Sequence, residues 1–108
     1  MAWIVELLDA RVRDELEALP ADMKARFRRI VELIQDHGLD RVREPHVKRL
    51  EGALWEMRMK GKDGISRAIY VTAKGRRVVV VRVFVKKTQK TPRRELDLAL
   101  QRAEEINP

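Results

Sequence analysis

The sequence predicts an α+β fold with the element order β-α-α-β-β-β-α. A small twisted antiparallel sheet would carry an N-terminal helical hairpin and a C-terminal helix. Apolar residues recur with helical spacing in residues 9–38 and 92–106, whereas residues 54–87 form alternating or β-branched runs separated by glycine-containing turns. With 108 residues, 44% of them hydrophobic, we expect one domain over residues 1–108 with one modest core.

The N-terminal part of the chain predicts one strand and a pair of helices. Residues 2–7, AWIVEL, are apolar and partly β-branched, which favours a short strand, and residues 9–19 show helical spacing. A second helix can begin at Pro20, whose missing N–H is harmless in a first turn, and it ends at Gly38, because a left-handed C-terminal position favours glycine. We expect this antiparallel pair to cover one face of the sheet. The apolar stripe of the second helix is Met23, Phe27, Ile30, Val31 and Ile34.

The middle of the chain predicts a three-stranded meander that follows a loop through Pro45. In residues 54–60, LWEMRMK, an apolar set of side chains that includes Trp55 alternates with a polar set that includes Arg58. The sequences GKDG and KGR have the composition of turns, and they bound a second strand at residues 65–73.

The third strand, residues 77–87, is strongly apolar and ends in basic residues. Strict alternation would place Val79, Val81, Val83 and Val85 on one face, and Arg82, Phe84 and Lys86 on the other. With helices on one side only, the opposite side would be open and would carry Arg58, Lys60, Arg82 and Lys86. Arg67 and Tyr70 fall on opposite faces of an ideal strand, so they share a surface only if a bulge or strong twist intervenes.

A C-terminal helix completes the predicted fold. Thr91 and Pro92 have the residue types of an N-cap and a first helical position. The apolar stripe that follows is Leu96, Leu100, Ala103 and Ile106.

Positive charge is concentrated in one part of the chain. Residues 1–45 contain 8 Lys and Arg against 10 Asp and Glu, whereas residues 46–94 contain 15 against 3, so the net charges are −2 and +12. This polarisation would present one strongly positive surface, for which RNA, DNA or an acidic protein is a natural ligand. A solvated basic surface without a ligand is the alternative interpretation.

Several classes of function lack their characteristic residues. Without cysteine the chain cannot form a disulfide or a thiolate metal site, and His37 and His46 are too isolated for a histidine-based metal site. His46 could act as an acid–base group, although a surface loop histidine is the simpler interpretation. No P-loop, GxGxxG, HExxH or GxSxG motif occurs. No apolar run is long enough to span a bilayer and the N-terminus lacks signal-peptide features. We therefore expect a cytoplasmic protein with no membrane partner, metal or small-molecule cofactor.

A group of cationic and aromatic residues remains as the candidate site. Arginine grips phosphate in bidentate fashion and lysine supplies a mobile charge, so together they could bind RNA and stabilise a pentacoordinate phosphate. RNA carries its own 2′-OH nucleophile, and a lysine among other cations can have a lowered pKa and act as the base. Tyr70 could stack on a nucleobase or simply pack in the sheet, whereas Phe84 and Trp55 are more typical of a core. Binding of RNA or DNA without cleavage is the rival function. The group comprises Arg58, Lys60, Lys62, Arg67, Tyr70, Arg82, Lys86 and Lys87.

Three segments of the second half resemble a known family. LWEMRM, GKDGISRAIY and VFVKKTQKTPRRELDLA, all within residues 50–104, resemble the HigB-like, phage-derived Gp49-like branch of the RelE/ParE superfamily, the toxins of type II toxin–antitoxin systems. The resemblance implies a RelE-like fold and a ribosome-dependent mRNA endoribonuclease, or mRNA interferase. Such a toxin inhibits translation and is neutralised by a cognate antitoxin. ParE-like members poison DNA gyrase instead, and that activity is the alternative.

The resemblance also implies roles for individual residues. The implied catalytic residues are Arg67, Arg82, Lys86 and Lys87, and the implied RNA-binding residues are Arg58, Lys60, Lys62, Tyr70 and Lys90. The general base stays unassigned, because some relatives use histidines or a tyrosine where this chain has residues 86–89. For Arg82 the alternative is a structural ion pair with a carboxylate such as Glu56. The implied partners are mRNA, the ribosome and an antitoxin, taken to be a helix-turn-helix protein.

Overall fold

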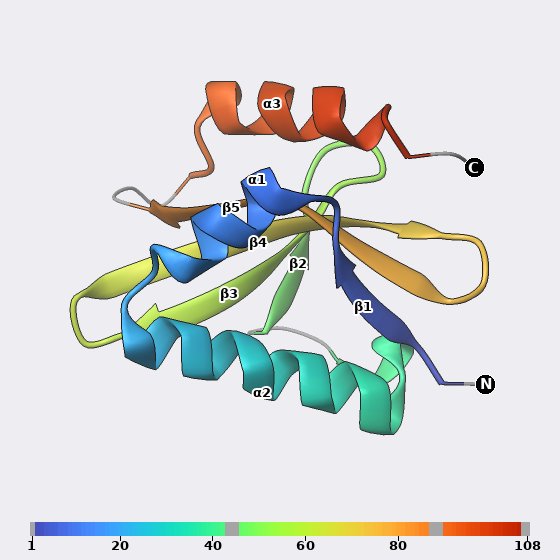
Figure 1. The fold of residues 1–108 in the computed structure, drawn as a ribbon, viewed down its shortest axis with the longest axis horizontal. Coiled ribbons are helices and arrows are strands. Elements are labelled where there is room, and N and C mark those ends of the chain that lie inside the picture. Colours follow the sequence, from blue (N-terminus) through green and yellow to red (C-terminus); the bar gives the residue numbers. More distant parts are fainter. Residues whose placement is uncertain (1, 43–45, 87–89, 107–108) are drawn as a thin grey trace.

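The computed structural model describes residues 2–42, 46–86 and 90–106, which form one five-stranded sheet with helices around it (Figure 1). The elements in chain order are β1 (Ile4–Leu7), α1 (Ala10–Glu17), α2 (Ala21–His37), the 3-10 helix η1 (Leu39–Arg41), β2 (Val47–Arg49), β3 (Trp55–Gly61), β4 (Gly64–Ala73), β5 (Arg77–Lys86) and α3 (Arg93–Ala103). The predicted α+β class is confirmed, with η1 and β2 as additions to the predicted order.

The sheet is mixed, because one of its strand pairs is parallel. Its strand order is β1-β5-β4-β3-β2, with β1 parallel to β5 and the other neighbours antiparallel. The unpredicted strand β2 pairs with β3 and forms an edge of the sheet. A strand of three residues is too short to show alternation in the sequence, so only its pairing reveals it.

A β-bulge in β5 changes the faces that strict alternation predicted. Ile69 pairs with Arg82 and Tyr70 pairs with Val80, so Val81 is an extra residue on β5. The cluster on the α3 side contains Val79 and Val81, and the cluster on the α2 side contains Val78, Val80 and Val83. The expected face of four alternate valines is therefore wrong, because one inserted residue reverses the alternation.

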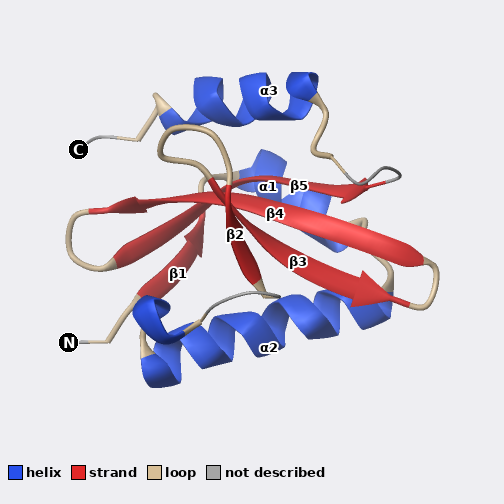
Figure 2. Ribbon diagram, turned by 180° about the vertical axis from the view of Figure 1, so that it is seen from behind, coloured by secondary structure: helices blue, strands red, loops and turns tan. Residues whose placement is uncertain are grey.

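Helices cover both faces of the sheet, which corrects the expectation of one open face. Figures 1 and 2 show α2 along one face and α3 along the other. The stripe predicted for α2 packs around Met57 and Tyr70, and the stripe predicted for α3 packs around Ile69 and Val81. Strand β4 is apolar on both faces because each face has a helix to cover it.

The helix α1 closes part of the β5 edge. β1 pairs with β5 only as far as Val80, and beyond that point the backbone N–H of Val83 donates to Glu15 Oε1 at 3.0 Å. The Glu15 carboxylate therefore accepts a hydrogen bond that a neighbouring strand would otherwise accept. This leaves less of the β5 edge open to pairing with a strand of another molecule.

The end of α2 follows the predicted glycine signal. Gly38 has a φ of 87°, in the left-handed region that favours glycine, and its backbone N–H donates to the carbonyl of Ile34. Among the residues that the structure describes, no helix combines the length and apolar character needed to cross a bilayer.

Candidate functional site

A basic pocket of about 200 Å³ opens on the α3 side of the sheet, beside the start of α3. Residues that pair across antiparallel strands share a face, so Lys48 lies with Glu56, and Arg58 lies with Arg67. The cationic side chains that line this pocket are Lys48, Arg58, Arg67, Lys86 and Lys90. Four of the predicted site residues are therefore brought together, with Lys48 as an addition.

A buried carboxylate holds the two arginines of the basic pocket. Glu56 is 1% exposed, its Oε2 forms an ion pair with the Arg67 guanidinium, and Arg58 Nε donates to the same oxygen at 3.3 Å. The Thr91 hydroxyl donates to Glu56 Oε1 at 3.0 Å. Thr91 is therefore not the N-cap of α3, a position that Pro92 occupies. One negative charge fixes two positive groups, and the pair of arginines keeps an excess of positive charge.

Arg67 has an unsatisfied donor although it is almost fully buried. Its exposed fraction is 3%, and this burial lowers the pKa of the guanidinium below its ordinary value. Within the described part of the chain, Arg67 Nε has no hydrogen-bond partner. A buried donor without a partner costs about 1–3 kcal/mol. Arg67 also lines the basic pocket, so its buried positive charge adds to the attraction of this pocket for an anion.

Lys86 is a buried lysine among other cations. It ends β5 with an exposed fraction of 7%. Burial, followed by the positive charges of Arg67, Arg58 and Lys48, lowers the pKa of the Lys86 ammonium to about 8. Both causes disfavour the charged form. Roughly a tenth of Lys86 is then neutral at pH 7, and a neutral amine can accept a proton.

Arg82 does not line the basic pocket, contrary to its implied role in phosphate binding. Its Nη1 lies 2.7 Å from Glu15 Oε2, and its Nε donates to Glu95 Oε1 at 2.7 Å. Arg102 Nη1 also reaches Glu15 Oε2, at 2.9 Å. These four charges form an ion-pair network that joins α1, β5 and α3. The structural alternative for Arg82 fits these contacts, with Glu15 and Glu95 in place of Glu56.

Tyr70 lies on the other side of the sheet from Arg67, as the alternation of β4 indicated. It is 1% exposed and belongs to the core on the α2 side, where burial raises the pKa of its phenol. A ring so deeply covered offers little surface on which a nucleobase could stack, so its burial favours the alternative of strand packing for Tyr70.

The other predicted lysines differ in their positions. Lys60 and Lys62 are exposed on β3 and on the β3–β4 turn, and neither lines the basic pocket. Asp22 holds the turn in place by accepting from the backbone N–H of Lys62 at 2.8 Å. Lys90 lines the pocket near its rim. Lys87 lies outside the described residues.

Glu56, Lys48 and Thr91 are among the residues of the basic pocket that were not predicted as site residues from the sequence. Glu56 alternates with Arg58 along β3, so a shared face was a signal that could have found it. Lys48 gave no signal because β2 was not predicted. Thr91 was assigned to a helix cap, and only the folded chain brings it to Glu56. Among the described residues, no three His, Asp or Glu side chains are grouped so that they could hold a metal ion.

Comparisons with known proteins identify the family and the fold. Residues 14–104 match the family described as "Phage derived protein Gp49-like". A mutant of the E. coli toxin RelE in the free state has a TM-score of 0.67 at 16% identity, over 94% of this chain and 98% of that chain. A chain of the archaeal RelE–RelB complex from Pyrococcus horikoshii OT3 has a TM-score of 0.56 at 23% identity, over 79% and 96%. No curated protein sequence matches the chain.

The family match and the fold agree with the resemblance seen in the sequence. The matched residues include β2 to β5 and all of α3, the elements that build the basic pocket. The likeness to RelE extends to almost the whole chain. This chain therefore belongs to the phage-derived Gp49-like family and adopts the fold of the RelE toxins.

Proposed function

We propose that this protein is the toxin of a type II toxin–antitoxin module and inhibits translation by cutting mRNA on the ribosome. The observation that carries the proposal is Lys86, a buried lysine with a lowered pKa beside two arginines that Glu56 anchors. A surface that only binds RNA gains nothing from a lysine that is partly neutral, whereas a general base requires one.

In the proposed reaction the neutral Lys86 amine takes the proton of a ribose 2′-OH. The 2′ oxygen attacks the adjacent phosphorus, and the bond to the 5′ oxygen of the next nucleotide breaks. The products are a 2′,3′-cyclic phosphate and a 5′-hydroxyl, whose oxygen takes a proton from solvent. Arg58 and Arg67 stabilise the additional negative charge on the pentacoordinate phosphate. This charge is absent from the bound substrate and develops as the transition state is reached.

The proposed partner is a cognate antitoxin, for which the archaeal relative in a complex named RelE–RelB offers a parallel. We expect an acidic or amphipathic segment of the antitoxin to cover the basic surface of residues 46–94, or to wrap the helical hairpin beside it. A helix-turn-helix protein would fit this role. The ribosome as site of action implies a cytoplasmic protein.

Mapping of mRNA ends by primer extension after induction tests the proposal. Wild-type protein should give cuts at fixed positions within codons, and these cuts should vanish when translation is blocked. Arg58→Ala should weaken cleavage roughly 10- to 150-fold, because one charge-assisted contact is worth about 1.5–3 kcal/mol. Lys74→Ala, which removes one exposed charge on the β4–β5 turn, is the matched control and should cut like wild type. Intact mRNA with broken DNA would instead identify a gyrase poison.

A further inference from the structure

A second hollow, larger than the basic pocket, lies on the α2 side of the sheet near β2. This groove has a volume of about 950 Å³, and both tryptophans of the chain, Trp3 and Trp55, line it. Each tryptophan is partly buried: one part of its side chain packs against the core, and another part is exposed to solvent. Tyr70 and Leu39 line the same hollow, which we call the aromatic groove.

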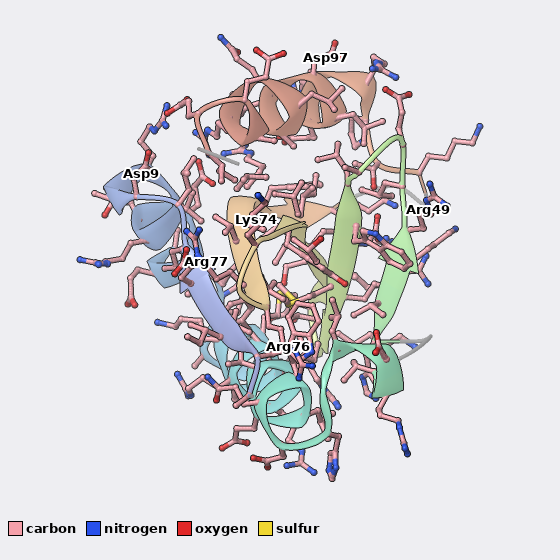
Figure 3. The ribbon with its side chains drawn as sticks, turned by 90° about the vertical axis from the view of Figure 1, so that its right-hand side faces the viewer. Asp9, Arg49, Lys74, Arg76, Arg77 and Asp97 are labelled. Atoms are coloured by element: carbon pink, nitrogen blue, oxygen red, sulfur yellow. The ribbon has the colours of Figure 1, made fainter. Side chains whose placement is uncertain are left out.

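The edge strand β2 connects the aromatic groove with the basic pocket. Lys48 lines both of them. Lys48 pairs with Glu56 and so lies on the pocket side, whereas the next residue, Arg49, pairs with Trp55 and so lies on the groove side. Both basic side chains are exposed, and Figure 3 shows Arg49 on β2 at this side of the molecule. A chain of phosphates that passes over this edge would meet one cation on each face.

We propose that the aromatic groove binds a nucleobase of the same RNA whose phosphate occupies the basic pocket. The base stacks on Trp55, and Lys48 and Arg49 hold the backbone where it crosses β2. Aromatic faces beside basic residues are the usual components of single-strand binding sites, since every base has a π-face and every nucleotide a phosphate. The inference rests on the proposed function and adds a subsite for a neighbouring nucleotide.

A nucleic acid fits the groove better than an apolar protein segment does. Among the described residues that line the groove, the cations Lys48 and Arg49 stand against one carboxylate, that of Asp40. The groove is also continuous, through Lys48, with the pocket that holds the phosphate-binding arginines. An apolar helix or strand in the groove would offer these exposed cations no negatively charged group to contact.

The test measures binding of a short single-stranded 2′-O-methyl RNA, which lacks the nucleophile and so stays uncut. Because both tryptophans line the groove, their intrinsic fluorescence should be quenched as the RNA binds. Trp55→Ala should weaken the affinity roughly 5- to 150-fold, as loss of one stacked base predicts. Trp55→Phe, which keeps an aromatic face, should retain most of it. Arg49→Glu leaves the core intact and should also weaken binding, whereas Lys74→Glu, an equal charge reversal on the β4–β5 turn, should weaken it less.

An Arg67→Lys variant in the same assay separates the subsite from the proposed function. If Arg67→Lys weakens binding but Trp55→Ala and Arg49→Glu do not, the subsite is wrong and the groove is left to a protein partner. If the groove variants weaken binding and Arg67→Lys does not, the subsite holds and the phosphate site in the basic pocket is wrong. RNA binding without any tryptophan quenching would also overturn the subsite.

Discussion

At the scale of single residues, Lys86 sets the expected pH dependence of cleavage. Its pKa of about 8 lies well below the ordinary lysine value of 10.5, and only the neutral amine accepts a proton. Cleavage should therefore rise about tenfold between pH 7 and pH 9, as the neutral fraction rises from roughly a tenth to nine tenths, and then level off. Single-turnover cleavage of end-labelled mRNA on programmed ribosomes, followed against pH, measures this profile.

The variant Lys86→Arg distinguishes a base from a simple phosphate contact. Arginine keeps the positive charge but stays protonated throughout this pH range, so it can hold phosphate and cannot act as the base. Cleavage should fall about 10²- to 10⁴-fold while RNA affinity is retained, and the rise with pH should disappear. Lys74→Arg, at the far end of the β4–β5 hairpin, is the matched control. A Lys86→Arg protein as active as wild type would limit Lys86 to phosphate binding.

At the scale of elements, the network of Arg82, Glu15, Glu95 and Arg102 holds α1 and α3 to β5. Arg82 keeps 22% of its side chain exposed, so its removal should cost somewhat less than the 3–5 kcal/mol typical of a fully buried pair. We expect Arg82→Ala to lose roughly 2–3 kcal/mol of stability, and the melting temperature to fall by about 10–20 °C. Cleavage per folded molecule should stay unchanged, because Arg82 does not line the basic pocket.

Melting curves and growth arrest measured on the same variants check this expectation. Arg94→Ala removes an exposed arginine at the start of α3 and should change neither property. A stable Arg82→Ala protein with reduced toxicity would contradict the structural role and return Arg82 to the catalytic group.

The elements that could be predicted are those with enough local periodicity. β1, both helices of the hairpin, the three strands of the meander and α3 all show it, and all are present. β2 and the bulge at Val81 depend on pairing with other strands, which a run of similar valines does not specify. The helices on both faces do have a signal in β4, because the residues of this strand are apolar on both of its sides, which is typical of a strand covered on both faces.

In the candidate site, too, the features that depend on local alternation could be predicted, and those that depend on contacts distant in the sequence could not. Arg58, Arg67 and Lys86 meet because alternation along paired strands brings them to one face. For Arg58 and Lys86, the alternation within their own strands already predicted a shared side of the sheet. The position of Arg82 could not be predicted, because its partners Glu15 and Glu95 come from helices distant in the sequence.

At the scale of the whole molecule, the uneven charge should govern association with an antitoxin. Glu56 offsets one charge of the Arg58 and Arg67 pair, but residues 46–94 contain 15 Lys and Arg against only 3 Asp and Glu, so a large excess of positive charge is left. We expect fast, charge-steered association whose rate constant falls as salt rises from 50 to 300 mM, since exposed charges are screened beyond about 10 Å at 0.1 M. Stopped-flow measurement with the purified antitoxin follows this rate. A rate constant indifferent to salt would rule out electrostatic capping of the basic surface.

The parallel pairing of β1 with β5 has a consequence for the newborn chain. β1 is translated well before its partner β5, because every element from α1 to β4 lies between them in the chain. Thr91 and Lys90, which border the basic pocket, follow later still. At about 5–20 residues per second, translation of residues 4–86 takes roughly 4–17 s, and β1 cannot pair with β5 before then. If the protein is the toxin proposed above, the nascent chain lacks its basic pocket during that interval, and an antitoxin already in the cell has that time in which to reach it.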